Sequence, residues 1–136
     1  MRWVALLPLR GGSKSIPGKN LRTIAGRPLY AWSLEAALDS GCFDAIYVMA
    51  DAEDIRADAR ARYGARIEVV DRDPANATDT ASSESVMLEL AANVDCDVLC
   101  LIQATSPLTR VEDFRAARAR FESEGLDSLL TGVELK

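Results

Sequence analysis

Apolar and polar residues alternate along this chain in blocks that predict strands separated by helices. Short apolar runs predict buried strands at residues 3–9, 45–50, 66–70, 97–103 and 128–135. Helices are predicted over residues 28–41, 52–64, 82–94 and 109–125. Because strands and helices alternate, the sequence predicts a mostly parallel sheet covered on both faces, a Rossmann-like three-layer α/β/α sandwich.

Several helix boundaries carry recognisable signals. Pro28 lies in the first turn of the first predicted helix, and Gly41 follows its end. Thr109 and Glu112 have the spacing of a capping box at the start of the last helix. Four apolar residues of that helix form one stripe that is expected to belong to the core: Val111, Phe114, Ala117 and Phe121.

Composition sets the broad class of the protein. The 136 residues suffice for about one domain, and 49% hydrophobic with 27% charged residues is typical of a soluble globular chain. No apolar stretch reaches the roughly 18 residues that a membrane span requires. Arg10 and Lys14 interrupt the apolar start, so a signal peptide is not predicted. Cys42, Cys96 and Cys100 lack metal-ligand spacing, which favours a reducing, cytoplasmic location.

The chain contains no histidine, which excludes Ser-His-Asp and Cys-His catalysis and histidine-ligated zinc. Carboxylates, backbone amides, lysines, arginines or a hard metal ion must then carry any chemistry. The net charge of −5 argues against a nucleic-acid partner. Residues 1–34 nevertheless contain only basic charges: Arg2, Arg10, Lys14, Lys19, Arg22 and Arg27. Such a local basic cluster in an acidic protein suits a small anionic ligand.

Ligands of this fold class bind outside the carboxyl ends of the strands. Polar or glycine-rich segments follow the first four predicted strands, at residues 10–19, Asp51, residues 71–80 and residues 103–110. These segments are therefore expected to gather at one edge of the sheet.

The glycine-rich loop after the first strand matches neither the dinucleotide fingerprint nor a Walker A loop. Gly12 and Gly18 are six positions apart rather than five, and Lys19 is followed by Asn20 rather than Ser or Thr. Glycines still let backbone N–H groups approach an anion, and lysines and arginines add positive charge. The composition fits both a triphosphate-binding loop and an ordinary flexible turn.

Three ordered segments resemble the acylneuraminate cytidylyltransferases, the synthetases of CMP-sialic acid. They are LPLRGGSKSIPGKNLRTIAGRPL (7–29), DRDPANATDTASS (71–83) and LIQATSPL (101–108). The resemblance covers essentially the whole chain and implies a sheet of the nucleotide-diphospho-sugar transferase type. It also implies transfer of CMP from CTP to the anomeric hydroxyl of a nine-carbon 2-keto acid sugar, with release of pyrophosphate and assistance from Mg²⁺. The partners would be CTP and an acidic sugar, with no nucleic acid and no membrane.

The resemblance also assigns roles to individual residues. Arg10, Lys14 and Lys19 correspond to catalytic residues that neutralise the triphosphate and the leaving pyrophosphate. The nucleotide-binding set comprises Arg10, Gly11, Gly12, Ser13, Lys14, Asn20, Arg72 and Ser83. Gln103 corresponds to a sugar-binding glutamine, and Asp51 to an acidic residue near the metal, although VMAD stands here where relatives often read Ser-Thr-Asp.

Simpler interpretations exist for several of these residues. Asn20 could close a turn, Ser83 could cap a helix and Gln103 could satisfy a strand end. Asp71 and Asp73 have the form of a metal-binding Asp-x-Asp pair. The resemblance, however, assigns the function in that triplet to Arg72.

Relatives continue well beyond the length of this chain, and their later part supplies the principal metal-binding aspartates and a dimer extension. Residues 1–136 are therefore expected to form a single nucleotide-binding domain without that C-terminal portion, and a homodimer is expected only with it. Three alternatives remain open: an inactive CTP-binding module, a cytidylyltransferase for legionaminic or pseudaminic acid, and a UDP- or GDP-sugar pyrophosphorylase. The last should show a Gly-x-Gly-Thr-Arg segment, which the sequence lacks.

Overall fold

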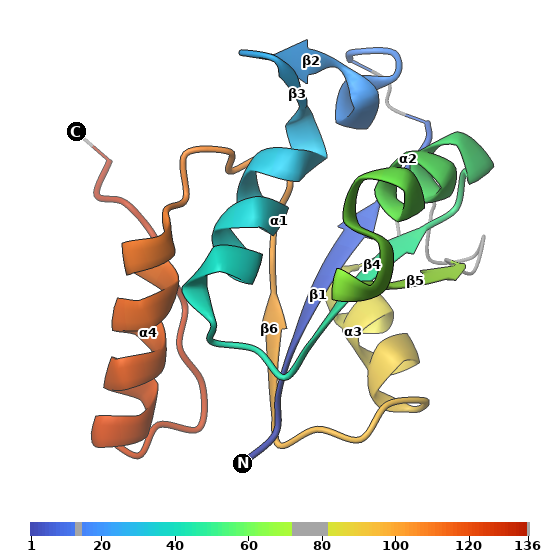
Figure 1. The fold of residues 1–136 in the computed structure, drawn as a ribbon. Helices are drawn as coiled ribbons and strands as arrows, with labels where there is room; N and C mark the ends of the chain where they lie inside the picture. The colour runs from blue at the N-terminus through green and yellow to red at the C-terminus, as the bar shows by residue number, and fades with distance from the viewer. Residues whose placement is uncertain (13–14, 72–81, 136) are drawn as a thin grey trace.

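A parallel sheet forms the centre of the computed structural model, which describes residues 1–12, 15–71 and 82–135 (Figure 1). Its four strands are β1 (Trp3–Leu9), β4 (Ala45–Ala50), β5 (Glu68–Asp71) and β6 (Val98–Leu101). They lie in the order β5-β4-β1-β6, and every neighbouring pair is parallel. The predicted parallel sheet is confirmed, with β1 hydrogen-bonded on both edges.

Helices cover both faces of this sheet. In the described parts of the chain these are α1 (Leu29–Ser40), α2 (Glu53–Tyr63), α3 (Ser83–Ala91) and α4 (Val111–Ser123). α1 and α2 pack on one face against alternate residues of β1, Ala5, Leu7 and Leu9. α3 packs on the other face against Val4 and Leu6, and α4 lies beside α1 (Figure 1). The period-two alternation of β1 therefore separates two buried clusters.

The ends of the helices agree with most of the predicted signals. α1 follows Pro28 and ends at Ser40, and the next residue, Gly41, has the positive φ of 68° that terminates many helices. The stripe on α4 is half-buried and packs as expected. Phe114 stacks edge-on with Phe43 at 5.8 Å between ring centroids, and Phe121 with Trp3 at 5.3 Å.

The predicted capping box of α4 is wrong by one residue. The helix begins at Val111, and the Asp113 carboxylate accepts a hydrogen bond of 2.8 Å from the backbone N–H of Arg110. Thr109 instead donates its hydroxyl to the carbonyl oxygen of Ser106 at 2.9 Å. The threonine therefore closes the preceding turn, which displaces the start of the helix toward the C-terminus.

A small hairpin between Asn20 and α1 has no counterpart in the predicted elements. It consists of β2 (Thr23–Ile24) and β3 (Arg27–Pro28), preceded by the single-turn helix η1 (Lys19–Leu21). Both residues of its turn have positive φ, 49° at Ala25 and 87° at Gly26. Alanine seldom adopts this conformation, so the turn lacks the usual Asn-Gly or Asp-Gly signature.

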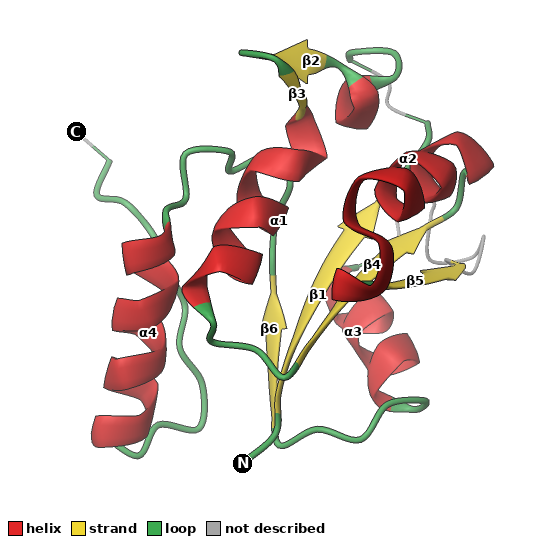
Figure 2. Cartoon of the chain, in the orientation of Figure 1, coloured by secondary structure: helices red, strands yellow, loops and turns green. Residues whose placement is uncertain are grey.

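Residues 128–135 do not form the strand predicted from their apolar pattern. Figure 2 draws this segment as loop, and Leu130, Val133 and Leu135 are 96%, 88% and 96% exposed. A strand needs a neighbour that completes its hydrogen bonds, and an apolar sequence alone does not supply one.

The three cysteines are free thiols. Burial raises the pKa of Cys100 to about 11, so this thiol stays protonated at neutral pH. Within the described ranges, the helices are all too short or too polar to cross a membrane.

Two tyrosine hydroxyls join α1 to α2. Tyr30 of α1 donates to the Asp58 carboxylate of α2, and Tyr63 of α2 donates to the Glu35 carboxylate of α1 at 3.0 Å. Burial, and then these hydrogen bonds, raise the pKa of both phenols far above the ordinary value.

These tyrosines predict a loss of stability in alkali. Because the folded state holds both phenolic protons more tightly than the unfolded chain, the free energy of unfolding should fall as the pH rises above about 10. Denaturant titrations between pH 8 and 11 would measure this slope. The double variant Tyr30→Phe/Tyr63→Phe should show a shallower decline, and equal slopes would contradict the assignment.

Candidate functional site

A pocket opens at the carboxyl ends of β1 and β6, where the strand order reverses direction. β1 has β4 on one side and β6 on the other, and such a switch point is where α/β sheets bind ligands. The pocket has a volume of about 170 Å³. Its lining comes from four separate segments: Pro8, Arg10, Gly12, Lys19, Asn20, Ser82, Ser83, Val86, Gln103, Ala104 and Thr105.

Six of the site residues predicted from the sequence line this pocket. They are Arg10, Gly12, Lys19, Asn20, Ser83 and Gln103. Gly11 and Asp51 lie beside it and bind each other. Ser13, Lys14 and Arg72 lie outside the described residues. The expected gathering at the carboxyl edge is therefore observed for the described residues, while their roles remain predictions.

The glycine loop approaches the end of β4 very closely. The backbone N–H of Gly11 donates to Asp51 Oδ1 at 2.7 Å. A Cβ at Gly11 would lie 2.7 Å from the Cβ of Ala52, closer than real contacts allow. A Cβ at Gly12 would meet nothing within 4 Å. Position 11 thus requires glycine for packing, whereas position 12 faces open space in the pocket.

Asn20 closes the loop that begins at Arg10. Its side-chain Nδ2 donates to the carbonyl oxygen of Arg10 at 2.8 Å, and the residue is buried. Gly18, in the left-handed conformation with φ of 62°, turns the chain into η1 and so delivers Lys19 and Asn20 to the pocket. Asn20 therefore closes this turn and also forms part of the pocket wall.

The start of α3 forms a second side of the pocket. Ser82, not Ser83, caps this helix, because the Ser82 Oγ accepts a hydrogen bond of 3.1 Å from the Ser85 N–H. Ser83 occupies the first turn of the helix and lines the pocket. Backbone N–H groups at the start of α3 add partial positive charge on this side.

The loop after β6 is held by a residue that sequence reasoning missed. Ser33, fully buried on α1, donates its hydroxyl to the carbonyl oxygen of Ser106 at 2.9 Å, with the Gln103 carbonyl oxygen at 3.5 Å. This contact fixes the turn that presents Gln103, Ala104 and Thr105 to the pocket. A polar residue on the apolar face of a helix is the sequence signal that could have identified it.

Only part of the basic N-terminal cluster lines the pocket. Arg10 and Lys19 do so. Arg27, in contrast, pairs with Glu35 at 3.6 Å and stacks over the Trp32 ring. Arg2 donates to the Asp95 carbonyl oxygen before β6, at the opposite end of the sheet. The local positive charge of the pocket is therefore smaller than the sequence count suggests.

The described residues do not assemble a metal centre. No group of three or more Cys, Asp or Glu side chains in the described ranges is placed to hold an ion. Asp51 uses one carboxylate oxygen to accept the Gly11 N–H, and Asp71 pairs with Arg56 at 3.2 Å. Asp73 lies outside the described residues. A metal role for Asp51 stays a prediction.

Comparison with known proteins gives a consistent result. A family model described as cytidylyltransferase matches residues 4–134. The chain is 39% identical to the N-acylneuraminate cytidylyltransferase of Oncorhynchus mykiss, over 95% of this chain and 29% of that protein. It is also 39% identical to the CMP-N,N'-diacetyllegionaminic acid synthase of Legionella pneumophila, over 86% of this chain and 52% of that protein. The pseudaminic acid cytidylyltransferase of Campylobacter jejuni is 36% identical to this chain, over 100% of this chain and 60% of that protein. The chain thus spans between 29% and 60% of the length of these relatives.

Solved structures show the same fold. A CMP:2-keto-3-deoxy-manno-octonic acid synthetase complexed with CTP has a TM-score of 0.78 at 23% identity, covering 92% of this chain and 49% of that one. A cytidylyltransferase from Leptospira borgpetersenii has a TM-score of 0.71 at 18% identity, covering 90% and 50%. The predicted nucleotidyltransferase type of fold is thereby confirmed.

The contact of Gly11 with Ala52 predicts unequal effects of two neighbouring substitutions. Gly11→Ala should lower the free energy of unfolding by about 1–3 kcal/mol, the usual cost of overpacking. Gly12→Ala, with open space around the new methyl group, should change stability by less than about 0.5 kcal/mol. Urea denaturation of both variants measures the difference. Equal effects would show that the close approach does not exist in solution.

Proposed function

The chain belongs to the cytidylyltransferase family, and on that premise we propose that it binds CTP in the pocket between β1 and β6. The bound CTP would then donate CMP to the anomeric hydroxyl of a 2-keto acid sugar. One observation carries the proposal. Two cations, Arg10 and Lys19, meet Gly12, Asn20 and Gln103 in a single pocket at the switch point of the sheet, although the sequence spreads them over more than ninety positions.

In this transfer the anomeric hydroxyl gives up its proton to solvent, its oxygen forms a bond to the α-phosphorus, and the bond from that phosphorus to the bridging oxygen of pyrophosphate breaks. Negative charge accumulates on the leaving pyrophosphate. Arg10 and Lys19 would offset that charge by charge-assisted hydrogen bonds to the phosphate oxygens. The loop that Asn20 closes would hold the phosphates in line for attack.

The proposed acceptor is a nine-carbon sugar acid of the sialic-acid type. The relatives that support this choice are named for N-acylneuraminate, N,N'-diacetyllegionaminic acid and pseudaminic acid, which belong to one class of sugar acid. We place Gln103 beside the incoming sugar, because it lies at the end of the pocket formed by the loop after β6. Ser33 would hold this loop in place.

The proposal includes Mg²⁺ as the metal that shields the triphosphate when it is bound. Among the described residues, no group of three or more Cys, Asp or Glu side chains is placed to hold it. The cytoplasmic location and a homodimer also remain predictions.

A CTP-binding module without turnover is the second candidate. The absence of a metal-ligating group among the described residues favours it. Both candidates predict CTP binding, and only the first predicts release of pyrophosphate.

Thermal denaturation with Mg²⁺ and CTP, UTP, ATP or GTP tests the nucleotide site. CTP at about 100 times its dissociation constant should stabilise the chain by about 2.7 kcal/mol, which raises the melting temperature by several degrees. The other nucleotides should have smaller effects. A cooperative melt that no nucleotide shifts would reject the proposal.

Substitution of a pocket lysine gives the matched test. Lys19→Gln should weaken CTP binding by about tenfold, because a charge-assisted contact to phosphate is lost. Arg120→Gln, which removes an exposed cation of α4 that does not line the pocket, serves as the control and should bind CTP normally. Pyrophosphate release with CTP and each of the three sugar acids then separates the enzyme from the inactive module.

A further inference from the structure

The backbone of Gly11 is held at two points by the turn that follows β4. Its N–H donates to Asp51 Oδ1 at 2.7 Å, and its Cα packs so closely on Ala52 that a side chain would collide there. Gly11 stands between Arg10 and Gly12, which both line the pocket. The position of the pocket wall therefore depends on where Asp51 and Ala52 lie.

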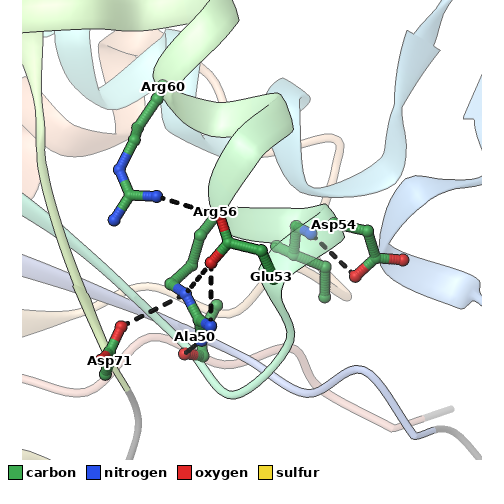
Figure 3. Close-up of polar contacts among 7 residues, drawn as sticks. Ala50, Glu53, Asp54, Arg56, Arg60 and Asp71 are labelled. Carbon is green, nitrogen blue, oxygen red and sulfur yellow. Dashed lines mark hydrogen bonds and ion pairs between the residues drawn. The ribbon is translucent and has the colours of Figure 1, made fainter.

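That turn is itself anchored by Arg56 on the first turns of α2 (Figure 3). The guanidinium donates to the carbonyl oxygen of Ala50, the last residue of β4, at 2.8 Å. It also pairs with Asp71, the last residue of β5, at 3.2 Å, and with Glu53 at 3.0 Å. Only 15% of the Arg56 side chain is exposed. One nearly buried cation thus joins the carboxyl ends of two neighbouring strands, immediately before Asp51.

We propose that Asp51 is a positioning residue for the nucleotide pocket, which fixes Gly11 through its carboxylate, and that Arg56 holds the turn that carries Asp51. The inference rests on the proposed function of the pocket. Glycine has no side chain to restrict its backbone, so an external restraint is needed to hold a glycine loop in a single conformation. A loop ordered before the ligand arrives binds more tightly, because less conformational entropy is lost on binding.

The chemistry of the contact distinguishes this role from that of a metal ligand. A hydrogen-bond acceptor at position 51 needs an oxygen but not a charge, and the side-chain carbonyl of asparagine supplies one. A Mg²⁺ ligand works chiefly through its negative charge, which asparagine lacks. Asp51→Asn and Asp51→Ala therefore separate the two roles.

The decisive experiment measures CTP affinity of the full chain by calorimetry at several Mg²⁺ concentrations. Asp51→Asn should bind CTP within about threefold of the unsubstituted chain, whereas Asp51→Ala should bind about tenfold more weakly at every Mg²⁺ concentration. An asparagine variant as weak as the alanine variant, with a loss that shrinks as Mg²⁺ rises, would overturn the positioning role.

Hydrogen exchange of the Gly11 amide in the free protein provides a readout that does not depend on CTP. Exchange should accelerate at least tenfold in Asp51→Ala and remain slow in Asp51→Asn, because only alanine removes the acceptor. Unchanged exchange in the alanine variant would overturn the proposal. If the unsubstituted chain binds no CTP, the proposed function fails, while this measurement still decides whether Asp51 restrains the loop.

Two arginines of α2 test the second part of the proposal. Arg56→Gln should accelerate exchange of the Gly11 amide and weaken CTP binding several-fold, since the ends of β4 and β5 lose their shared anchor. Arg60→Gln is the matched control, because Arg60 pairs with Glu53 at 3.4 Å and is 52% exposed (Figure 3). Equal effects of the two substitutions on Gly11 exchange would overturn the role of Arg56.

Discussion

The double pairing of β1 is the constraint on which the rest of this structure depends. β1 is hydrogen-bonded to β4 on one edge and to β6 on the other, and its residues from Val4 to Leu7 are fully buried. Such a strand can neither slip nor tilt without exposing one face of the core. The chain that leaves β1 after Leu9 must therefore emerge between the ends of two neighbouring strands, and the pocket forms at that point.

Both neutral and charged side chains hold the loops at the carboxyl edge of the sheet. Asn20 and Ser33 donate to backbone carbonyl oxygens and order the loops after β1 and β6. The Asp51 carboxylate accepts a hydrogen bond from the Gly11 N–H, and the Arg56 guanidinium donates to the carbonyl oxygen of Ala50 at the end of β4. Arg10 and Lys19 line the pocket. The groups that shape the site are thus largely different from the cations that we assign to the phosphates.

Local sequence signals predicted those elements whose stability comes from burial. β1 and β4 were predicted to the residue, and α1 to within one residue at each end, because apolar periodicity and the flanking proline and glycine agree there. The sequence did not predict the hairpin of β2 and β3. The left-handed position in its turn is occupied by an alanine, Ala25, and not by the Gly, Asn or Asp that usually marks such a turn. For residues 128–135 the prediction was wrong in the other direction. Their apolar pattern predicts a strand, but the segment has no neighbouring strand to pair with and forms a loop.

The sequence by itself determined the alternation of strands and helices, and hence that polar loops such as 10–19 and 103–110 share one edge of a parallel sheet. It also determined which residue types are present to meet an anion. Only the tertiary structure decided which of them meet. Arg10 and Lys19 lie in the same pocket, whereas Arg2 and Arg27 make contacts outside it. The contacts of Ser33, Asp51 and Arg56 likewise appear only in the folded chain. Such contacts join residues forty or more positions apart, or link strand ends whose order in the sheet no local pattern encodes.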